Sequence, residues 1–169
     1  MSLIVCKFGG TSVASPERIK MVANKLIAKK KAGDDVVAVV SAMGKTTDEL
    51  VGLANALNTN PPARELDRLL STGEQVSMTL LAMALEAQGY HAMSFTGRQA
   101  GIRTDGTHNK AKIVSVPCEI FLCLLDEVLP VQHHYPAAAA ALYLYIRPGA
   151  GNRPFRAAAC VGLFHEYPV

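Results

Sequence analysis

The chain has 169 residues, of which 50% are hydrophobic, and its formal net charge at pH 7 is +3. This length and hydrophobic content are those of a folded domain with a sizeable core, which excludes a disordered chain. The net charge is too small for a nucleic-acid-binding protein, and the basic residues are not accompanied by aromatic side chains on which bases could stack.

The cysteines and the amino terminus indicate the compartment. The four cysteines show neither the paired spacing of a zinc site nor the density of a disulfide-rich secreted domain. The first residues lack the basic and apolar segments of a signal peptide, and no apolar run reaches the ~18 residues of a membrane span. We therefore expect a cytoplasmic protein that does not interact with a membrane.

The chain opens with an expected strand and an amphipathic helix. Residues 3–6 are apolar, and Ser15 is a suitable cap for a helix whose first residue is Pro16. Apolar residues then recur on one face until Gly33 ends the helix. The lysines at 29–31 would close its last turn, where cations suit the negative end of the helix dipole, and this explains them more simply than a binding patch does.

The next segments predict an α/β fold. Residues 36–40 form a continuous β-branched run, typical of a strand that is buried on both faces of a parallel sheet. Helices are then expected at 47–57, 65–70 and 73–88, with a proline break at 61–62, and a third strand at 91–95. The predicted architecture has three layers: an open, mostly parallel sheet with helices on both faces.

The segment KFGGTS, residues 7–12, directly follows the first strand. Ligands of open parallel sheets bind beyond the carboxyl ends of the strands, which is where this segment falls. Gly9 and Gly10 allow backbone N–H groups to approach an anion closely, and Lys7 adds a positive charge. The pattern is neither a Walker A loop nor GxGxxG. The alternative is a tight strand-to-helix turn with a solvated lysine.

A second loop of small and polar residues, SAMGKTTDEL at 41–50, follows the second buried strand. In a parallel sheet both loops leave the same edge, which would place Ser41 and Thr47 near the glycines. Thr47 is alternatively only the N-cap of the helix that follows.

A third segment, STGEQ at 71–75, contains an acidic residue after three small ones. Ser71 and Glu74 have the spacing of a capping box, in which Glu74 would serve only the helix terminus. The alternative is that Glu74 supplies a negative charge opposite the ammonium group of a substrate.

The segments KFGGTSV, VVSAMGKTTDEL, STGEQVS and GIRTDGTHNKAKI together resemble the aspartate kinases of the amino-acid kinase superfamily, over about residues 2–114. The resemblance implies an amino-acid kinase-like fold and a role for each motif. The loop that would hold the ATP phosphates is formed by Lys7, Phe8, Gly9, Gly10 and Ser12. By the same resemblance, Ser41 and Thr47 contact the substrate L-aspartate, and Glu74 meets its amino group.

The implied reaction transfers the γ-phosphoryl group of ATP to the β-carboxylate of L-aspartate. The products are ADP and 4-phospho-L-aspartate, the first step toward lysine, threonine and methionine. A carboxylate needs no general base, so catalysis is mainly alignment and charge neutralisation, with Lys7 as the catalytic residue. Magnesium would travel with the nucleotide phosphates, so no protein metal site is expected. A homo-oligomer is compatible with the sequence, which leaves the oligomeric state open.

Residues 104–109 form a turn by composition. The resemblance suggests a loop near the substrate, with Arg103 as a weaker candidate for contact. A surface turn is the simpler interpretation of Asp105 and His108, to which we assign no chemical role.

Composition changes near residue 114. Every lysine and methionine lies before it, and most prolines and tyrosines lie after it. We expect residues 1–114 to be the amino-terminal lobe of an amino-acid kinase domain, and 115–169 to be an unmatched tail, truncated or frame-shifted, that leaves the fold incomplete. The tail holds an apolar run at 117–129, a strand candidate at 142–146, and two adjacent histidines that are more simply solvated than metal ligands.

The tail lacks a second glycine loop resembling GRGGSD, which aspartate kinases use for the nucleotide. Residues 147–151 are glycine-rich but have no serine or acidic residue, so we do not accept them as a substitute. The alternative function is therefore a catalytically inactive aspartate kinase fragment that lacks the nucleotide-binding half and associates through exposed sheet edges.

Overall fold

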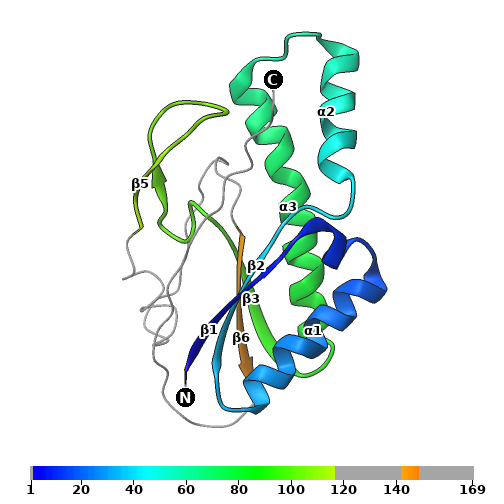
Figure 1. The fold of residues 1–169 in the computed structure, drawn as a ribbon, viewed down its shortest axis with the longest axis vertical. Coiled ribbons are helices and arrows are strands. Elements are labelled where there is room, and N and C mark those ends of the chain that lie inside the picture. The colour runs from blue at the N-terminus through cyan, green and yellow to red at the C-terminus, as the bar shows by residue number, and fades with distance from the viewer. Residues whose placement is uncertain (1, 117–141, 149–169) are drawn as a thin grey trace.

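The computed structural model describes residues 2–116 and 142–148 (Figure 1). A four-stranded sheet in the order β1-β2-β6-β3 lies at its centre. Its strands are β1 (Leu3–Phe8), β2 (Asp35–Val40), β3 (Tyr90–Thr96) and β6 (Leu142–Pro148). Strands β1 and β2 are parallel, and β6 runs antiparallel to both β2 and β3. Three of the four strands thus share one direction, and the expected open, mostly parallel α/β sheet is confirmed.

Three helices and a small hairpin accompany this sheet. The helices are α1 (Pro16–Lys31), α2 (Thr46–Leu57) and α3 (Ala63–Glu86), preceded by a 3-10 turn, η1 (Gly10–Val13). The hairpin consists of β4 (Arg103–Thr104) and β5 (Ile113–Ser115). Helices α1 and α3 pack against each other and the sheet, while α2 packs against α3 (Figure 1).

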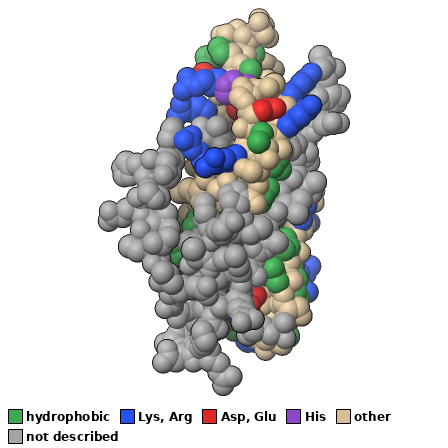
Figure 2. All heavy atoms as spheres, turned by 90° about the vertical axis from the view of Figure 1, so that its left-hand side faces the viewer, with side chains coloured by type: hydrophobic (Ala, Val, Ile, Leu, Met, Phe, Trp, Pro, Cys, Tyr) green, Lys and Arg blue, Asp and Glu red, His purple; other side chains and the backbone are tan. Residues whose placement is uncertain are grey.

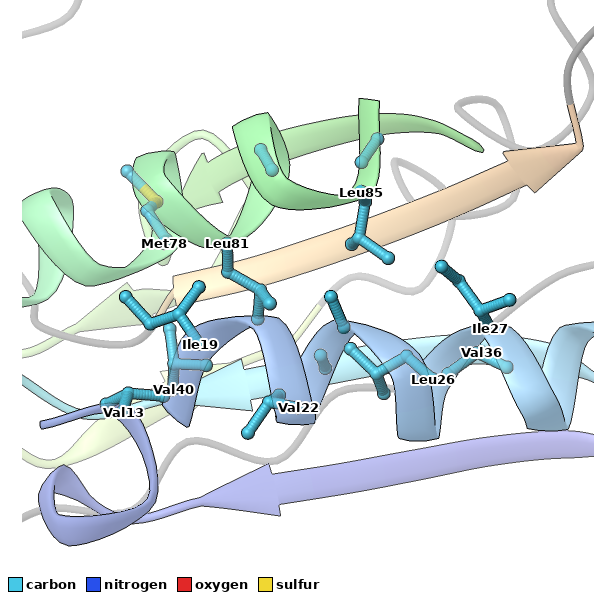
Figure 3. Close-up of a cluster of buried hydrophobic side chains, with 14 residues drawn as sticks. Val13, Ile19, Val22, Leu26, Ile27, Val36, Val40, Met78, Leu81 and Leu85 are labelled. Carbon is cyan, nitrogen blue, oxygen red and sulfur yellow. The ribbon is translucent and has the colours of Figure 1, made fainter. Parts of the chain in front are cut away.

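The core lies between β2 and the two long helices (Figure 3). Alternate residues of β2 point into it, in agreement with the two-residue period of a strand. They meet apolar faces of α1 and α3, where Leu26, Leu81 and Leu85 are fully buried. Burying each such side chain stabilises the fold by about 1.5–3 kcal/mol. All six residues of β2 are buried, as expected for a strand covered on both faces.

The start of α1 confirms its expected cap. Ser15 has an extended backbone, its Oγ accepts a hydrogen bond from the backbone N–H of Arg18 at 3.4 Å, and Pro16 is the first helical residue. Because proline has no N–H and its φ suits a helix, it fits this first position.

The expected break between two helices at 70–73 is wrong. Residues 63–86 form one continuous helix, α3, so Ser71 and Glu74 lie inside it and do not form a capping box. The hydroxyls of Ser71 and Thr72 donate to the carbonyl oxygens of Arg68 and Leu69 within the helix, at 2.8 and 2.6 Å. Residues whose hydroxyls favour caps and turns are therefore accommodated here without ending the helix.

The expected strand at 142–146 is confirmed as β6, which lies between β2 and β3. The apolar run at 117–129 and the histidines at 133 and 134 lie outside the described residues. The division of the chain at residue 114 stays a prediction, although β6, from beyond that point, belongs to the same sheet as β1.

One lysine at the end of α1 forms a buried ion pair. Lys30 Nζ lies 2.8 Å from Asp35 Oδ1, and the two side chains are only 8% and 7% exposed. This pair ties the last turn of α1 to the start of β2. It supports the interpretation of the lysine cluster as part of the helix terminus.

Replacing Asp35 by Asn is expected to lower the free energy of unfolding by about 3 kcal/mol, because the buried ion pair between Lys30 and Asp35 is lost. Urea denaturation followed by circular dichroism would measure this. The control is Glu65→Gln, which breaks the exposed pair between Arg64 and Glu65 and should cost less than about 1 kcal/mol. Equal losses in the two variants would contradict a structural role for the buried pair.

Candidate active site

The parallel strands β1 and β2 end at the same edge of the sheet. Phe8 is paired with Val40, and the backbone N–H of Ser41 donates to the carbonyl oxygen of Phe8 at 3.1 Å. The two loops that follow therefore leave the sheet side by side. Ligands of open α/β sheets bind in this position, beyond the carboxyl ends of the strands.

The first two loops are in direct backbone contact. The N–H of Gly44 donates to the carbonyl oxygen of Gly10 at 3.0 Å. A Cβ atom on Gly10 would lie 2.7 Å from the carbonyl oxygen of Ala42, closer than carbon and oxygen can approach without displacing the backbone. Glycine at position 10 is thus required by the approach of the second loop.

The third motif, on helix α3, packs closely against Ala42 of the second loop. A Cβ atom on Gly73 would lie 2.9 Å from the Cβ of Ala42 and 3.4 Å from the Cγ2 of Thr46. Ala42 itself is buried. The three motifs, separated by more than 60 residues from first to last, therefore converge on Ala42.

The residues expected to bind phosphate differ in their surroundings. Lys7 lies on an exposed position of β1, whereas Phe8 is partly buried and packs against the hydrophobic core. A Cβ atom on Gly9 would meet no atom within 4 Å in the described part of the chain, which leaves open space next to its backbone. The N–H of Ser12 donates to the carbonyl oxygen of Gly9 at 2.9 Å, so the loop curls into η1.

Each residue expected to bind the substrate is the chain neighbour of a residue at the place where the three motifs converge. Ser41 precedes Ala42, Thr47 follows Thr46 in the first turn of α2, and Glu74 follows Gly73 on α3. All three are partly buried, and the Oε2 atom of Glu74 is buried. Helix α2 begins at Thr46 and the cap position is occupied by Lys45, so Thr47 is not the N-cap of this helix.

One residue of this site was not singled out from the sequence. Ser77 is fully buried, and its Oγ lies 2.8 Å from the carbonyl oxygen of Ser41 and 3.0 Å from that of Glu74. It therefore links the second loop to α3 directly beside the two expected substrate contacts. In the sequence, the only feature that points to Ser77 is its position in the segment STGEQVS.

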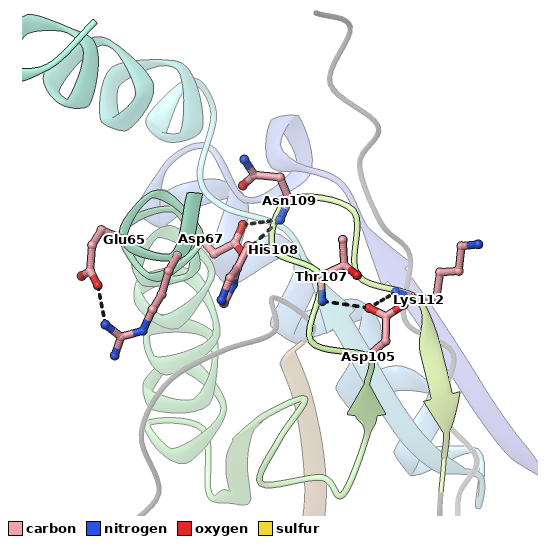
Figure 4. Close-up of polar contacts among 8 residues, drawn as sticks. Glu65, Asp67, Asp105, Thr107, His108, Asn109 and Lys112 are labelled. Atoms are coloured by element: carbon pink, nitrogen blue, oxygen red, sulfur yellow. Dashed lines mark hydrogen bonds and ion pairs between the residues drawn. The ribbon is translucent and has the colours of Figure 1, made fainter. Parts of the chain in front are cut away.

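The hairpin of β4 and β5 carries an ordered loop. The carboxylate of Asp105 accepts hydrogen bonds from the backbone N–H groups of Lys112 and Thr107, both at 3.2 Å (Figure 4). The hydrogen bond from Lys112, which has the larger effect, and that from Thr107 hold the pKa of the Asp105 carboxyl below its usual value. Asp105 thus orders the loop of the hairpin through backbone hydrogen bonds.

The hairpin lies on a face that is rich in cations. Figure 2 shows Lys and Arg side chains gathered on the upper part of this face. The exposed cations of the hairpin segment are Arg103, Lys110 and Lys112. A positive potential on this side would attract an anionic ligand.

Metal-ligand clusters and membrane-spanning helices are both absent from residues 2–116 and 142–148. This part of the chain contains no group of three or more histidine, cysteine or acidic side chains that could hold a metal ion. None of its helices is both long and apolar enough to cross a membrane.

The fold and the three converging motifs define a class of protein. Residues 2–143 match the model of the amino acid kinase family, which covers more than half of the chain. The chain belongs to this family.

Within the family, the chain is similar to aspartokinases. It is 60% identical over 127 residues to the aspartokinase of Bacillus sp. (strain MGA3), and 54% identical over 127 residues to aspartokinase 2 of Bacillus subtilis (strain 168). In both comparisons the match covers 75% of this chain and 31% of the relative. The aspartokinase of Mycobacterium bovis is 58% identical over 116 residues, or 69% of this chain and 28% of the relative. The chain thus spans about a third of the length of these relatives.

Two solved structures are similar to the fold. Aspartate kinase from Synechocystis has a TM-score of 0.57 and 54% sequence identity, over 58% of this chain and 17% of that one. Aspartokinase III of E. coli, solved in complex with aspartate and ADP, has a TM-score of 0.59 over 76% of this chain and 38% of that one. Its sequence identity is only 20%, so this second likeness shows the fold alone.

Proposed function

We propose that the chain is an aspartate kinase-like phosphotransferase, which transfers the γ-phosphoryl group of ATP to the β-carboxylate of L-aspartate. The observation that carries the proposal is the convergence of three motifs on Ala42, at the carboxyl edge of β1 and β2. The aspartokinases to which the chain is similar support this choice of substrate. The reaction would stand at the start of lysine, threonine and methionine synthesis.

The first loop fits the phosphate end of a nucleotide. The open space beside Gly9 allows a phosphate oxygen to reach the backbone, where a larger side chain would stand in the way. Lys7 is exposed and can place its ammonium group against the phosphoryl group in transfer. Ser12, within η1, adds a hydroxyl donor. Together these groups would bind the phosphates and neutralise their charge, which is the main catalytic requirement in phosphoryl transfer.

The second and third motifs fit an amino-acid substrate. Ser41 and Thr47 offer hydroxyl groups to its carboxylates, and Glu74 offers a carboxylate to its ammonium group. These residues are fixed through the contacts of their neighbours Ala42, Thr46 and Gly73, so they present a preformed arrangement. Alignment of two bound reactants by rigid elements contributes much of the rate enhancement in such reactions.

Magnesium, when bound with the nucleotide, would neutralise phosphate charge. Since no acidic cluster that could hold a metal occurs among the described residues, phosphate oxygens and water are the ligands that we expect for it.

Isothermal titration of the chain with Mg-ATP and then with L-aspartate, alongside a coupled phosphorylation assay, tests the proposal. L-asparagine, which lacks the β-carboxylate, is the control ligand. Binding of both substrates with turnover supports an active kinase, whereas binding without turnover supports the inactive fragment as the function of this chain. Failure to bind L-aspartate, or equal binding of L-asparagine, would contradict the proposal.

A further inference from the structure

The hairpin of β4 and β5 is too small to be stable alone. Its strands have two and three residues, and their pairing is interrupted by a register shift. Two-stranded hairpins are at best marginally stable in water, so contacts with the rest of the protein decide where this one lies. At its base, Ala100 and Ile102 are buried and anchor the segment to the protein.

The tip of the hairpin is anchored separately, by Asp67 of α3 (Figure 4). The backbone N–H of Asn109 donates to Oδ2 of Asp67 at 3.1 Å, and Oδ1 is 3.3 Å away. Nδ1 of His108 lies 3.1 Å from Oδ2. Asn109 has a φ of 62°, a left-handed conformation that asparagine tolerates better than most residues. One carboxylate thus holds two consecutive residues of the loop.

Asp67 lies on the same face of α3 as Glu74. The two residues are seven positions apart, which is almost two full turns of an α-helix and about 10 Å along its axis. Glu65, by contrast, points away from the hairpin (Figure 4) and pairs with its neighbour Arg64. The hairpin tip therefore docks on the helix face that leads to Glu74.

We propose that Asp67 is a positioning residue of the substrate site. It holds the hairpin tip against α3, so that the hairpin forms a wall of the site on the helix face that also carries Glu74. The inference rests on the proposed function, since it assumes that Glu74 faces the substrate. Asp67 acts through the loop and does not itself touch the substrate.

Hydrogen exchange and L-aspartate binding of the full chain test this role together. In Asp67→Ala, we expect the amides of residues 105–112 to exchange about tenfold faster, because a hydrogen bond to a charged group contributes about 1.5 kcal/mol or more. The dissociation constant for L-aspartate should rise by about tenfold, since the wall of the site is no longer held. Affinity for Mg-ATP should stay unchanged, because the phosphate loop is separate from the hairpin.

Two variants serve as controls. Asp67→Asn should restore part of the protection and affinity, because its amide oxygen still accepts a hydrogen bond from Asn109. Glu65→Ala removes a carboxylate from the same helix without touching the hairpin, and should match the parent protein in both measurements.

The outcomes separate this proposal from the proposed function. If the parent chain binds L-aspartate and Asp67→Ala leaves the loop exchange unchanged, Asp67 does not hold the hairpin and the proposal is overturned. Faster exchange with unchanged L-aspartate affinity also overturns it, because the hairpin would then have no part in the site. If the parent does not bind L-aspartate, the proposed function fails and the positioning role fails with it.

Discussion

Replacing Lys7 by alanine is expected to lower turnover by about 100-fold or more and to weaken Mg-ATP binding, with little effect on stability. Lys7 occupies an exposed position at the end of β1, next to the glycine loop, and contributes nothing to the hydrophobic core. Removing one preorganised group that stabilises developing charge typically costs about 100- to 1,000-fold in rate. The coupled phosphorylation assay and isothermal titration would measure the two effects.

Lys25→Ala is the matched control for this variant. Lys25 is also exposed, lies on α1 and makes no contribution to the proposed site. It should retain the turnover and nucleotide affinity of the parent protein. If Lys7→Ala and Lys25→Ala behave alike, Lys7 is a solvated lysine in a tight turn, which is the alternative interpretation of this loop.

Gly10→Ala is expected to destabilise the fold by about 1–3 kcal/mol, the usual cost of forcing an extra methyl group into a packed region. The new Cβ would lie 2.7 Å from the carbonyl oxygen of Ala42 and 3.2 Å from that of Gly44. Both neighbours are backbone atoms, so a side-chain rotation cannot relieve the clash. The first two loops would separate, and L-aspartate affinity should fall with the free energy of unfolding. Urea denaturation and titration would measure these changes.

Gly9→Ala is the stability control, because it adds the same methyl group one residue away. There it meets no described atom within 4 Å, and the backbone of Gly9, with a φ of −72°, suits alanine. The free energy of unfolding should therefore be unchanged or rise by up to about 1 kcal/mol. Mg-ATP affinity should nevertheless fall, because the methyl group fills the space through which a phosphate approaches. A loss of stability equal to that of Gly10→Ala would contradict the packing explanation.

The local signals in the sequence predicted most of the elements. The β-branched run at 36–40 became the buried strand β2, and the pair Ser15 and Pro16 marked the first turn of α1. These signals depend on backbone preferences of residues close together in the chain, which is why they could be read directly.

The serine, threonine and glycine at 71–73 show how tertiary contact overrides such preferences. Their composition predicts a break, yet α3 continues through them. Glycine is needed at position 73 because a side chain there would clash with Ala42. The close packing of the second loop against α3 compensates for the lower helix propensity of glycine. Nothing local in the sequence reveals this contact.

Motifs whose residue types suit a phosphate and an amino acid identified the family, and local patterns predicted the main strands and helices. Three features became visible only in the folded chain: three motifs meet at Ala42, β6 lies between β2 and β3, and Asp67 holds a loop more than 40 residues away. The difference lies in the range of the interactions. Hydrophobic periodicity and capping act within a few residues, whereas loop convergence and strand order depend on packing among segments that are distant in the chain.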